Sequence, residues 1–356
     1  MDERVIAKID LSAIKNNLLH VKNDVGADIK IMSVLKANAY GHGAVSVAKY
    51  IEDIIDYIAV ATINEGISLR KKGILKPILV IGETVKEKLV YAKKSDIITT
   101  IFSKENFENY INYAKKHSIV SKVHLAVDTG MKRIGVMYDD YDTIYKVFTS
   151  PYLKVEGIFS HLASAEDPIF TLQQTTNFDK VINYLKNNNI PIPMRHIANS
   201  KGSINHNNCY DCVRIGIAQF IPEYKNLYPA MTLLARIVQI KKVKQGEPIG
   251  YDCSYIAKSD ICVATIAIGY ADGLMRSLSN MGKVLVNDIP CNIIGKVCMD
   301  FTMIDISGIP KVTVGDYVTI FGKEKITVQD LAYISSTITY EVLSRLSDRV
   351  KRVYKQ

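Results

Sequence analysis

The 356-residue sequence lacks any run of 18 apolar residues, so it predicts no membrane-spanning helix. The segment DERVIAKIDL after Met1 has no apolar core of the kind that signal peptides carry, and we therefore expect a cytoplasmic protein. Its six cysteines are scattered, which is typical of free thiols in a reducing compartment. Only Cys209 and Cys212 lie close together, and no second cysteine pair is adjacent to them, so we attribute their spacing to coincidence and expect no metal site.

A basic stripe interleaved with aromatic residues is also missing. The net charge of +9 is spread over segments such as RKKG and QIKKVK. This distribution gives little support to nucleic-acid binding, and attraction of small anionic molecules explains the charge equally well.

Short apolar runs alternate with amphipathic helical segments over residues 5–226. This alternation predicts a parallel sheet, and about eight units predict its closure into a (β/α)8 TIM-type barrel. Over residues 227–356, short strands are separated by Gly, Asp and Pro turns, which predicts a mainly β C-terminal domain that also takes residues 1–4. The expected fold class is therefore α/β. The predicted barrel strands are IAKIDL, IMSVLKA, YIAVAT, PILVIG, DIITTIF, KVHLAVD, VEGIFSHLA, MRHIANS and CVRIGIAQF.

Lys36 stands at the end of one such apolar run, in SVLKANAYGHG. A lysine here either reaches solvent from the strand end, as most lysines do, or is desolvated and attacks a carbonyl as a Schiff-base lysine. Polar residues follow the other predicted strands as well, and such a set at one barrel mouth suits a phosphorylated, anionic ligand. These residues are Lys36, Asp128–Arg133, His161, Asn199–Ser200 and Arg214.

Eight motifs follow one another along nearly the whole chain: VLKANAYGHG, DTGMKRIG, SHLASAED, HIANSKG, RIGI, GYADG, GKVCMD and TYEV. In this order the sequence resembles the alanine racemases, enzymes that use pyridoxal 5′-phosphate (PLP). The resemblance implies interconversion of L- and D-alanine by two bases, which supplies D-alanine for peptidoglycan.

The resemblance also implies the cofactor contacts. Lys36 matches the lysine that holds PLP covalently and then acts as a base. Arg214 matches the arginine that faces the pyridine nitrogen, where a donor-only side chain leaves this nitrogen unprotonated and suppresses side reactions such as transamination. The other matching cofactor residues are Tyr40, His161, Ser200, Gly216, Ile217 and Tyr340.

For the substrate, Arg133 matches an arginine that contacts the substrate carboxylate. Tyr251 matches the second base, which in this family comes from the other subunit, and Tyr270 and Met299 match residues of the same partner-derived wall. The resemblance therefore implies a head-to-tail homodimer with a shared active site and a small amino acid as its substrate.

Three departures from the family pattern leave the substrate range and the rate open, although we expect activity to survive them. Asp252 follows Tyr251 where a glycine is usual, and is expected to raise the tyrosine pKa or to favour a cationic substrate. Ile215 replaces a proline, and Ala126 replaces a lysine whose carbamate supports Arg133. Alanine remains the expected substrate, with serine and then a basic amino acid as alternatives.

Two alternatives come from other classes of protein. A PLP-dependent decarboxylase would place a carboxylate opposite the ring nitrogen, where this sequence has Arg214. A non-catalytic PLP-binding protein would be a single small barrel, which residues 230–356 argue against.

Overall fold

The computed structural model describes residues 3–204, 209–222 and 226–356, which form two compact units. Residues 15–38 and 44–227 make the first, here called the barrel unit; residues 1–14, 39–43 and 228–356 make the second, here called the β unit. Residues 1–2, expected in the C-terminal domain, and residues 205–208 and 223–225, expected in the barrel, lie outside the described residues.

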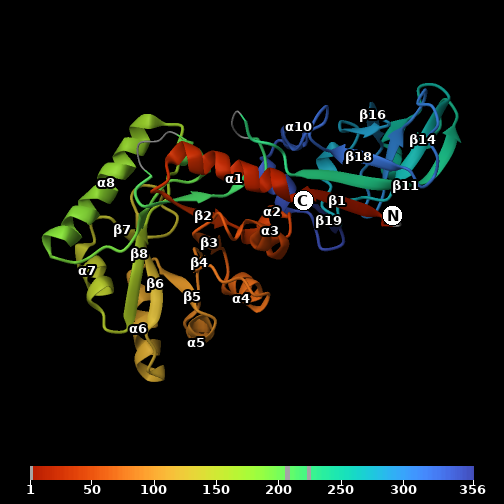
Figure 1. Cartoon of the computed structure of the whole chain (residues 1–356). Coiled ribbons are helices and arrows are strands. Elements are labelled where there is room, and N and C mark those ends of the chain that lie inside the picture. The colour runs from red at the N-terminus through yellow and green to blue at the C-terminus, as the bar shows by residue number, and fades with distance from the viewer. Residues whose placement is uncertain (1–2, 205–208, 223–225) are drawn as a thin grey trace. The chain divides into compact units, whose positions relative to one another are not determined.

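In the barrel unit, eight strands of the described residues pair in parallel in the order β10-β2-β3-β4-β5-β6-β8-β9. Figure 1 labels the strands from β2 to β8. Backbone bonds from Asp211 N to Arg195 O and from Arg214 N to Ala198 O connect the last strand to the first. The predicted barrel fold is therefore confirmed. The strands are β2 (Lys30–Val34), β3 (Tyr57–Val60), β4 (Ile78–Val80), β5 (Ile97–Ile101), β6 (Ser121–Asp128), β8 (Leu153–Phe159), β9 (Arg195–His196) and β10 (Cys212–Ile215), with the short β7 (Val136–Met137) beside β6.

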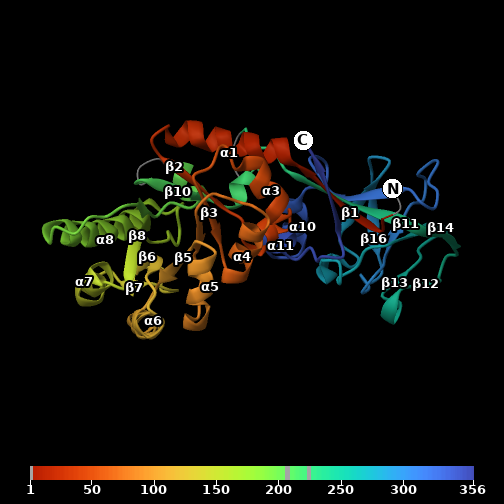
Figure 2. The same cartoon turned by 60° about the horizontal axis from the view of Figure 1, so that its bottom comes forward.

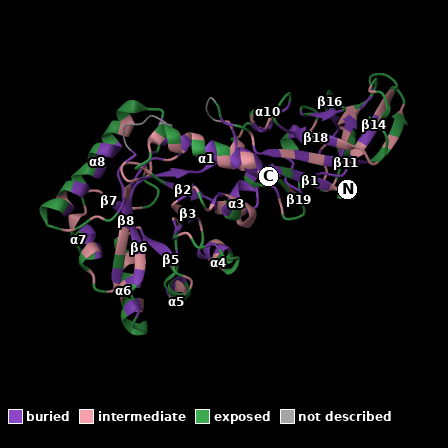
Figure 3. Cartoon of the chain, in the orientation of Figure 1, coloured by how far each residue is buried: buried purple, intermediate pink, exposed green. Residues whose placement is uncertain are grey.

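Helices lie around the outside of these strands (Figure 2). They expose one face and bury the other, while the strands are buried almost throughout (Figure 3). This is what continuous apolar strands and amphipathic helices dictate. The helices are α1 (Leu11–Val25), α2 (Lys36–Tyr40), α3 (Ala44–Ile51), α4 (Ile63–Lys71), α5 (Leu89–Lys94), α6 (Lys104–His117), α7 (Tyr141–Thr149), α8 (Pro168–Asn187) and α9 (Ser200–Ile204), with 3-10 turns η1 (Lys86–Lys88) and η2 (Ile217–Gln219).

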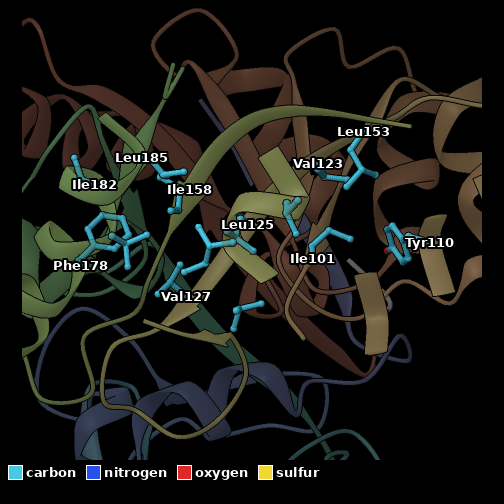
Figure 4. Close-up of a cluster of buried hydrophobic side chains, with 14 of the residues drawn as sticks. Ile101, Tyr110, Val123, Leu125, Val127, Leu153, Ile158, Phe178, Ile182 and Leu185 are labelled. Carbon is cyan, nitrogen blue, oxygen red and sulfur yellow. The ribbon is translucent and has the colours of Figure 1, made fainter. Parts of the chain in front are cut away.

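One buried cluster joins β5, β6 and β8 to the helices outside them (Figure 4). Phe178, Ile182 and Leu185 recur at helical spacing on α8 and turn one face of it towards this core. Val123, Leu125 and Val127 alternate on β6 and are equally buried. Close packing on both faces fixes where each strand ends, and therefore where the polar residues after it lie.

The β unit contains an eight-stranded sheet in the order β14-β17-β16-β15-β18-β11-β1-β19, with β14 also pairing with β11. This confirms the predicted mainly β C-terminal region. Its strands are β1 (Val5–Asp10), β11 (Met231–Val243), β14 (Ile261–Ile266), β15 (Lys283–Val286), β16 (Ile289–Ile294), β17 (Thr302–Asp305), β18 (Tyr317–Phe321) and β19 (Lys351–Lys355). The remaining elements are β12 (Pro248–Ile249), β13 (Tyr255–Ile256), η3 (Tyr251–Cys253), η4 (Arg276–Leu278), α10 (Val328–Ile334) and α11 (Thr339–Ser344).

The first strand corrects one expectation. IAKIDL was predicted to be the first barrel strand, but β1 pairs antiparallel with β11 and parallel with β19. A continuous apolar run is suited to any strand covered on both faces, so the pattern identifies a strand without identifying its sheet. Within the described ranges, no helix has the length and apolar character needed to cross a membrane.

Candidate active site

A cavity lies at the carboxyl ends of the barrel strands. Lys36 follows β2, Arg214 lies on β10, His161 follows β8 and Arg133 follows β6, and all four line this one cavity. Three of the four are cationic residue types, and Asp128 is the one carboxylate among the lining residues, so the cavity suits an anionic ligand. The lining residues are Lys36, Ile81, Ala126, Val127, Asp128, Met131, Arg133, Ile134, Phe159, Ser160, His161 and Arg214.

Lys36 is half-buried in this cavity rather than extended into solvent. Burial lowers the pKa of its ammonium below the usual value, and the positive charges of Arg133 and Arg214 lower it further, against an opposing effect of Glu65. A lysine with a lowered pKa more readily provides the neutral amine that attacks a carbonyl.

The helix that begins at Lys36 is left-handed. Ala37, Asn38, Ala39 and Tyr40 have φ angles of 51°, 54°, 54° and 51°. L-residues rarely form such a turn, because each Cβ crowds the following carbonyl at a cost of roughly 1–2 kcal/mol. Glu65 supports the turn by accepting a hydrogen bond from Ala37 N at 2.7 Å. Backbone strain of this kind persists where the surroundings enforce it, and it is common at functional sites.

Arg214 is a buried cation whose recorded hydrogen-bond partners are all neutral. Nη1 donates to Nδ1 of His196 at 2.7 Å, and Nη2 donates to the Ser160 and Ile197 carbonyls at 2.7 and 3.0 Å and to Nδ1 of His161 at 3.1 Å. Burial lowers its pKa to about 10, which leaves the guanidinium charged at neutral pH. Among the described residues, no acceptor is recorded for Nε, so this donor is available to a ligand in the cavity.

His161 is held in a neutral form. Burial lowers the pKa of its imidazole to about 3, and the cations Arg214, Arg133 and Lys36 add to the effect. Arginine donates but cannot accept, so Nδ1 of His161 accepts from Arg214 and its proton resides on Nε2.

A second polar group lies where β10 ends. The hydroxyl of Ser200, the first residue of α9, accepts from the amides of Gly216 at 2.9 Å and Ala218 at 3.4 Å. The amides around Ile217 and a hydroxyl that retains its own proton are thus gathered at one turn. Such backbone concavities bind phosphate groups.

Arg133 is exposed at the cavity, and among the described residues it has no recorded ion pair or hydrogen bond. Ala126 is buried and lines the same cavity, so no side chain from that position reaches out to support the arginine. The guanidinium of Arg133 is therefore free to pair with a carboxylate that enters from solvent.

In the β unit, Tyr251 begins the turn η3 with 68% of its surface exposed. Gly250, Asp252 and Cys253 around it have φ angles of 74°, 57° and 48°. Asp252 forms an ion pair with Lys296, which lowers the pKa of its carboxyl below the usual value. Asp252 occupies a left-handed position, and aspartate is among the residues that tolerate one.

Tyr270 and Met299 lie together in the same unit. Tyr270 N donates to Cys298 O, and Ala271 N donates to Met299 O, each at 3.0 Å. Gly269 makes this approach possible, because a Cβ there would lie 2.3 Å from the Cys298 and Met299 carbonyl oxygens. Tyr270 and Met299 remain 40% and 52% exposed.

Tyr40 and Tyr340 are also neighbours in the β unit. Their rings meet edge to face, with 5.9 Å between centroids and 67° between planes. The geometry is a favourable one for an aromatic pair and fixes the direction of both side chains.

Two residues of the site were not predicted as such from the sequence. His196 is hydrogen-bonded to Arg214, and His124 is hydrogen-bonded to His196. His196 begins the HIANSKG motif, but the motif did not identify it as a site residue. An isolated histidine in an apolar run gives no signal by itself, because core histidines look the same. Among the described residues, no group of three or more His, Cys, Asp and Glu is arranged to hold a metal ion.

Sequence comparison relates this site to known proteins. The family model for the alanine racemase N-terminal domain matches residues 9–223, and that for the C-terminal domain matches residues 230–354. The chain is 38% identical to an alanine racemase of Methanococcus maripaludis, with 98% of each chain covered. It is 39% identical to one of Halothermothrix orenii, with 98% of this chain and 96% of the other covered.

Solved structures agree over the same length. An alanine racemase of Clostridium difficile 630 superposes with a TM-score of 0.94 at 35% identity, covering 100% of this chain and 96% of the other. The alanine racemase of Bacillus anthracis with bound L-Ala-P superposes with a TM-score of 0.93 at 33% identity, with the same coverage. The alanine racemase of Bartonella henselae with covalently bound pyridoxal phosphate superposes with a TM-score of 0.86 at 28% identity, covering 99% of each chain. The chain therefore belongs to the alanine racemase family.

Proposed function

We propose that this protein interconverts L- and D-alanine with PLP as its cofactor. The observation that carries the proposal is Lys36, half-buried beside Arg133 and Arg214 in a cavity at the mouth of the barrel. The covalently bound pyridoxal phosphate of the Bartonella henselae relative and the L-Ala-P of the Bacillus anthracis relative support the choice of cofactor and substrate.

The residues present fit this cofactor. Its aldehyde requires an amine of lowered pKa, which Lys36 supplies, and its phosphate requires donors such as those at Ser200, Gly216 and Ile217. When bound, PLP withdraws electrons from the substrate and so acidifies its Cα–H bond. Arg214 would direct Nε towards the pyridine nitrogen without protonating it, and His161 would lie against the ring. We also assign phosphate contacts to Tyr40 and Tyr340.

Racemisation needs a base on each face of the substrate. Nζ of Lys36 would take or return the α-proton on one face, and the phenol oxygen of Tyr251 would do so on the other. We assign Tyr251 to a second copy of the chain, in a head-to-tail homodimer. The exposure of Tyr251, Tyr270 and Met299 supports this assignment, and Tyr251 lines one hollow with Cys298, the residue before Met299. Exposed apolar and aromatic groups that lie together are typical of an interface. Arg133 would hold the substrate carboxylate.

The competing substrates and reactions fit less well. Asp252 would favour a basic amino acid only if its charge were free, and Lys296 pairs with it. A decarboxylase would need a carboxylate opposite the ring nitrogen, and among the described residues Arg214 has only neutral partners. D-alanine formed in the cytoplasm would supply peptidoglycan.

A substrate panel tests the proposal. Purified protein with PLP is incubated with L-Ala, L-Ser, L-Lys or L-Arg, and the D-isomers are measured by chiral chromatography. We expect D-alanine to form fastest. Tyr251→Phe should lower the rate by at least about a hundredfold, since general-base catalysis contributes typically 10²–10⁴-fold, and should leave the visible absorption of bound PLP intact. No turnover of any substrate by a protein that binds PLP would overturn the racemase assignment.

A further inference from the structure

Three buried polar side chains form a line through the interior of the barrel. Nδ1 of His124 lies 2.9 Å from Nε2 of His196, and Nδ1 of His196 lies 2.7 Å from Nη1 of Arg214. All three are buried. They come from β6, β9 and β10, so the line runs from one side of the barrel to the residue that lines the cavity.

A glycine makes this line possible. The strand β8 lies between β6 and β9, and Gly157 of β8 is paired with His124. A Cβ on Gly157 would lie 2.7–2.9 Å from three atoms of the His124 ring. His124 and His196 therefore meet across β8 because Gly157 has no side chain there.

The chemistry of arginine fixes every proton along the line. A guanidinium only donates, so Nδ1 of His196 must accept and its proton must lie on Nε2. Nε2–H of His196 then donates to Nδ1 of His124, which places the His124 proton on Nε2 as well. That Nε2 has no hydrogen-bond partner among the residues that the structure describes, so the chain of donors ends at His124.

Both rings are kept neutral, and one of them is also stacked on an aromatic ring. Burial lowers the pKa of His124 to about 3 and that of His196 well below its usual value, and the charge of Arg214 lowers both further. Phe159 stacks on His196 with 5.0 Å between ring centroids and also lies 5.4 Å from the Arg214 guanidinium carbon. The Arg214 guanidinium is thus hydrogen-bonded to a neutral imidazole, which does not neutralise the positive charge that lines the cavity.

We propose that His124 is a positioning residue for the reaction, which acts by fixing the tautomer of His196 and through it the orientation of Arg214. The proposal rests on the proposed function, because Arg214 matters to the chemistry only if it faces the pyridine nitrogen. If His124 offers no acceptor, Nε2–H of His196 is buried without a partner, and a buried unsatisfied donor is unfavourable. A change of tautomer in His196 would not remove this cost, because the proton on Nδ1 would then face a donor of Arg214.

Two variants separate this role from simple packing. In His124→Asn, the amide oxygen occupies nearly the position of Nδ1 and can still accept from His196. In His124→Leu, the site keeps an apolar side chain of similar size but loses the acceptor. Each variant is studied as the PLP-loaded enzyme. Urea unfolding measures the free energy of unfolding of both variants, so that a difference in stability is not mistaken for a difference in catalysis.

We expect His124→Leu to lower kcat by roughly 5- to 100-fold, the range that an unsatisfied buried donor implies, with little change in KM because Arg214 does not touch the amino acid. The pyruvate released per racemisation turnover should rise several-fold in the same variant. It arises when the amino group of alanine stays on the cofactor and water supplies the keto oxygen, a side reaction that a displaced Arg214 no longer suppresses. His124→Asn should stay within about threefold of the wild type in both measurements.

The wild type provides an independent measurement. 15N NMR of the histidine-labelled holoenzyme should show His124 and His196 neutral, each with Nε2 protonated and Nδ1 accepting. A proton on Nδ1 of His196, or equal kcat and pyruvate ratios in the Leu and Asn variants, would overturn the positioning role while leaving the racemase assignment intact. A wild type that binds PLP but does not racemise alanine would instead contradict the proposed function, and the NMR pattern would still decide the proton positions.

Discussion

Asp252, the residue that follows Tyr251 in the sequence, forms an ion pair with Lys296 in the β unit. The departure from the family pattern at Asp252 predicts an effect on the pKa of the tyrosine or a preference for a cationic substrate. Lys296 bonds to the Asp252 carboxyl and lowers its pKa, with a smaller contribution from Arg276. The extra negative charge is therefore compensated locally.

This pairing predicts that Asp252 has little influence on substrate choice while Lys296 is present. Asp252→Asn should change kcat/KM for alanine by less than about fivefold, since an exposed ion pair contributes little. Lys296→Met leaves the carboxylate uncompensated and should increase the rate with L-Lys relative to L-Ala. Chiral chromatography of both substrates measures the ratio, and an unchanged ratio in Lys296→Met would show that Asp252 does not face the substrate.

The buried histidines predict a loss of stability in acid. The pKa values of His124 and His42 are lowered to about 3 and about 4, chiefly by burial. Between these values and the ordinary 6.5, the unfolded chain binds more protons than the folded one. The free energy of unfolding should therefore fall as the pH drops from 6.5 towards 4, by roughly 1.4 kcal/mol per pH unit for each histidine, and level off below the folded-state values.

Urea unfolding at pH 7, 6 and 5 measures this slope. Other groups contribute to it, so the informative quantity is the difference between the wild type and His124→Leu. The variant should lose less stability per pH unit, because it lacks one of the buried neutral histidines. Parallel slopes would mean that His124 is already protonated in the folded protein.

The sequence predicts where the strands of this fold lie better than it predicts which strands pair with one another. Continuous apolar runs identify the barrel strands, and polar residues at their ends identify the cavity around Lys36 and Arg214. The sheet that β1 joins depends on which partner covers it, and an apolar run of six residues does not encode that choice.

Local propensity fails at two places in the candidate site. Ala37 and Ala39 are good right-handed helix formers, yet they lie in a left-handed turn that Glu65 and the surrounding structure impose. The His124–His196 contact requires Gly157 and the strand order β6-β8-β9, which are relations in space rather than in sequence. Departures from local rules of this kind are expected at functional sites.

We predict that no residue larger than glycine is tolerated at position 41, next to Tyr40. Its φ is +81°, and a Cβ would lie 2.4 Å from the carbonyl oxygen of Leu343 on α11, the helix that carries Tyr340. Gly41→Ala combines left-handed strain with overpacking against backbone and should destabilise the protein by about 3 kcal/mol. It should also weaken PLP binding, because the Tyr40–Tyr340 pair would shift.

Gly246→Ala is the control for backbone strain alone. Its φ of +85° is nearly the same, and among the described residues no atom lies within 4 Å of the added Cβ. We expect a loss of only about 1 kcal/mol, with PLP affinity unchanged. Equal unfolding midpoints for the two variants would show that the segment around Leu343 can move aside.

The last prediction concerns the amine of Lys36, which would have to be neutral to attack the aldehyde of the proposed cofactor PLP. The pKa of Lys36 lies below its usual value because of burial and because Arg133 and Arg214 are positively charged. The rate of PLP capture by the apoprotein, followed by visible absorption, should therefore rise with pH and reach its midpoint below that of a free lysine. Lys36→Ala should abolish the absorption change.

Removal of a neighbouring charge tests the cause. Arg133→Met should move the midpoint to higher pH, since one of the cations that disfavour the charged lysine is gone. Lys132→Met removes the same charge from the adjacent residue, which is exposed and does not line the cavity. This control should leave the midpoint in place, because exposed charges outside the cavity are screened by water and salt. Identical shifts in the two variants would attribute the lowered pKa to the general positive charge of the protein rather than to the geometry of the site.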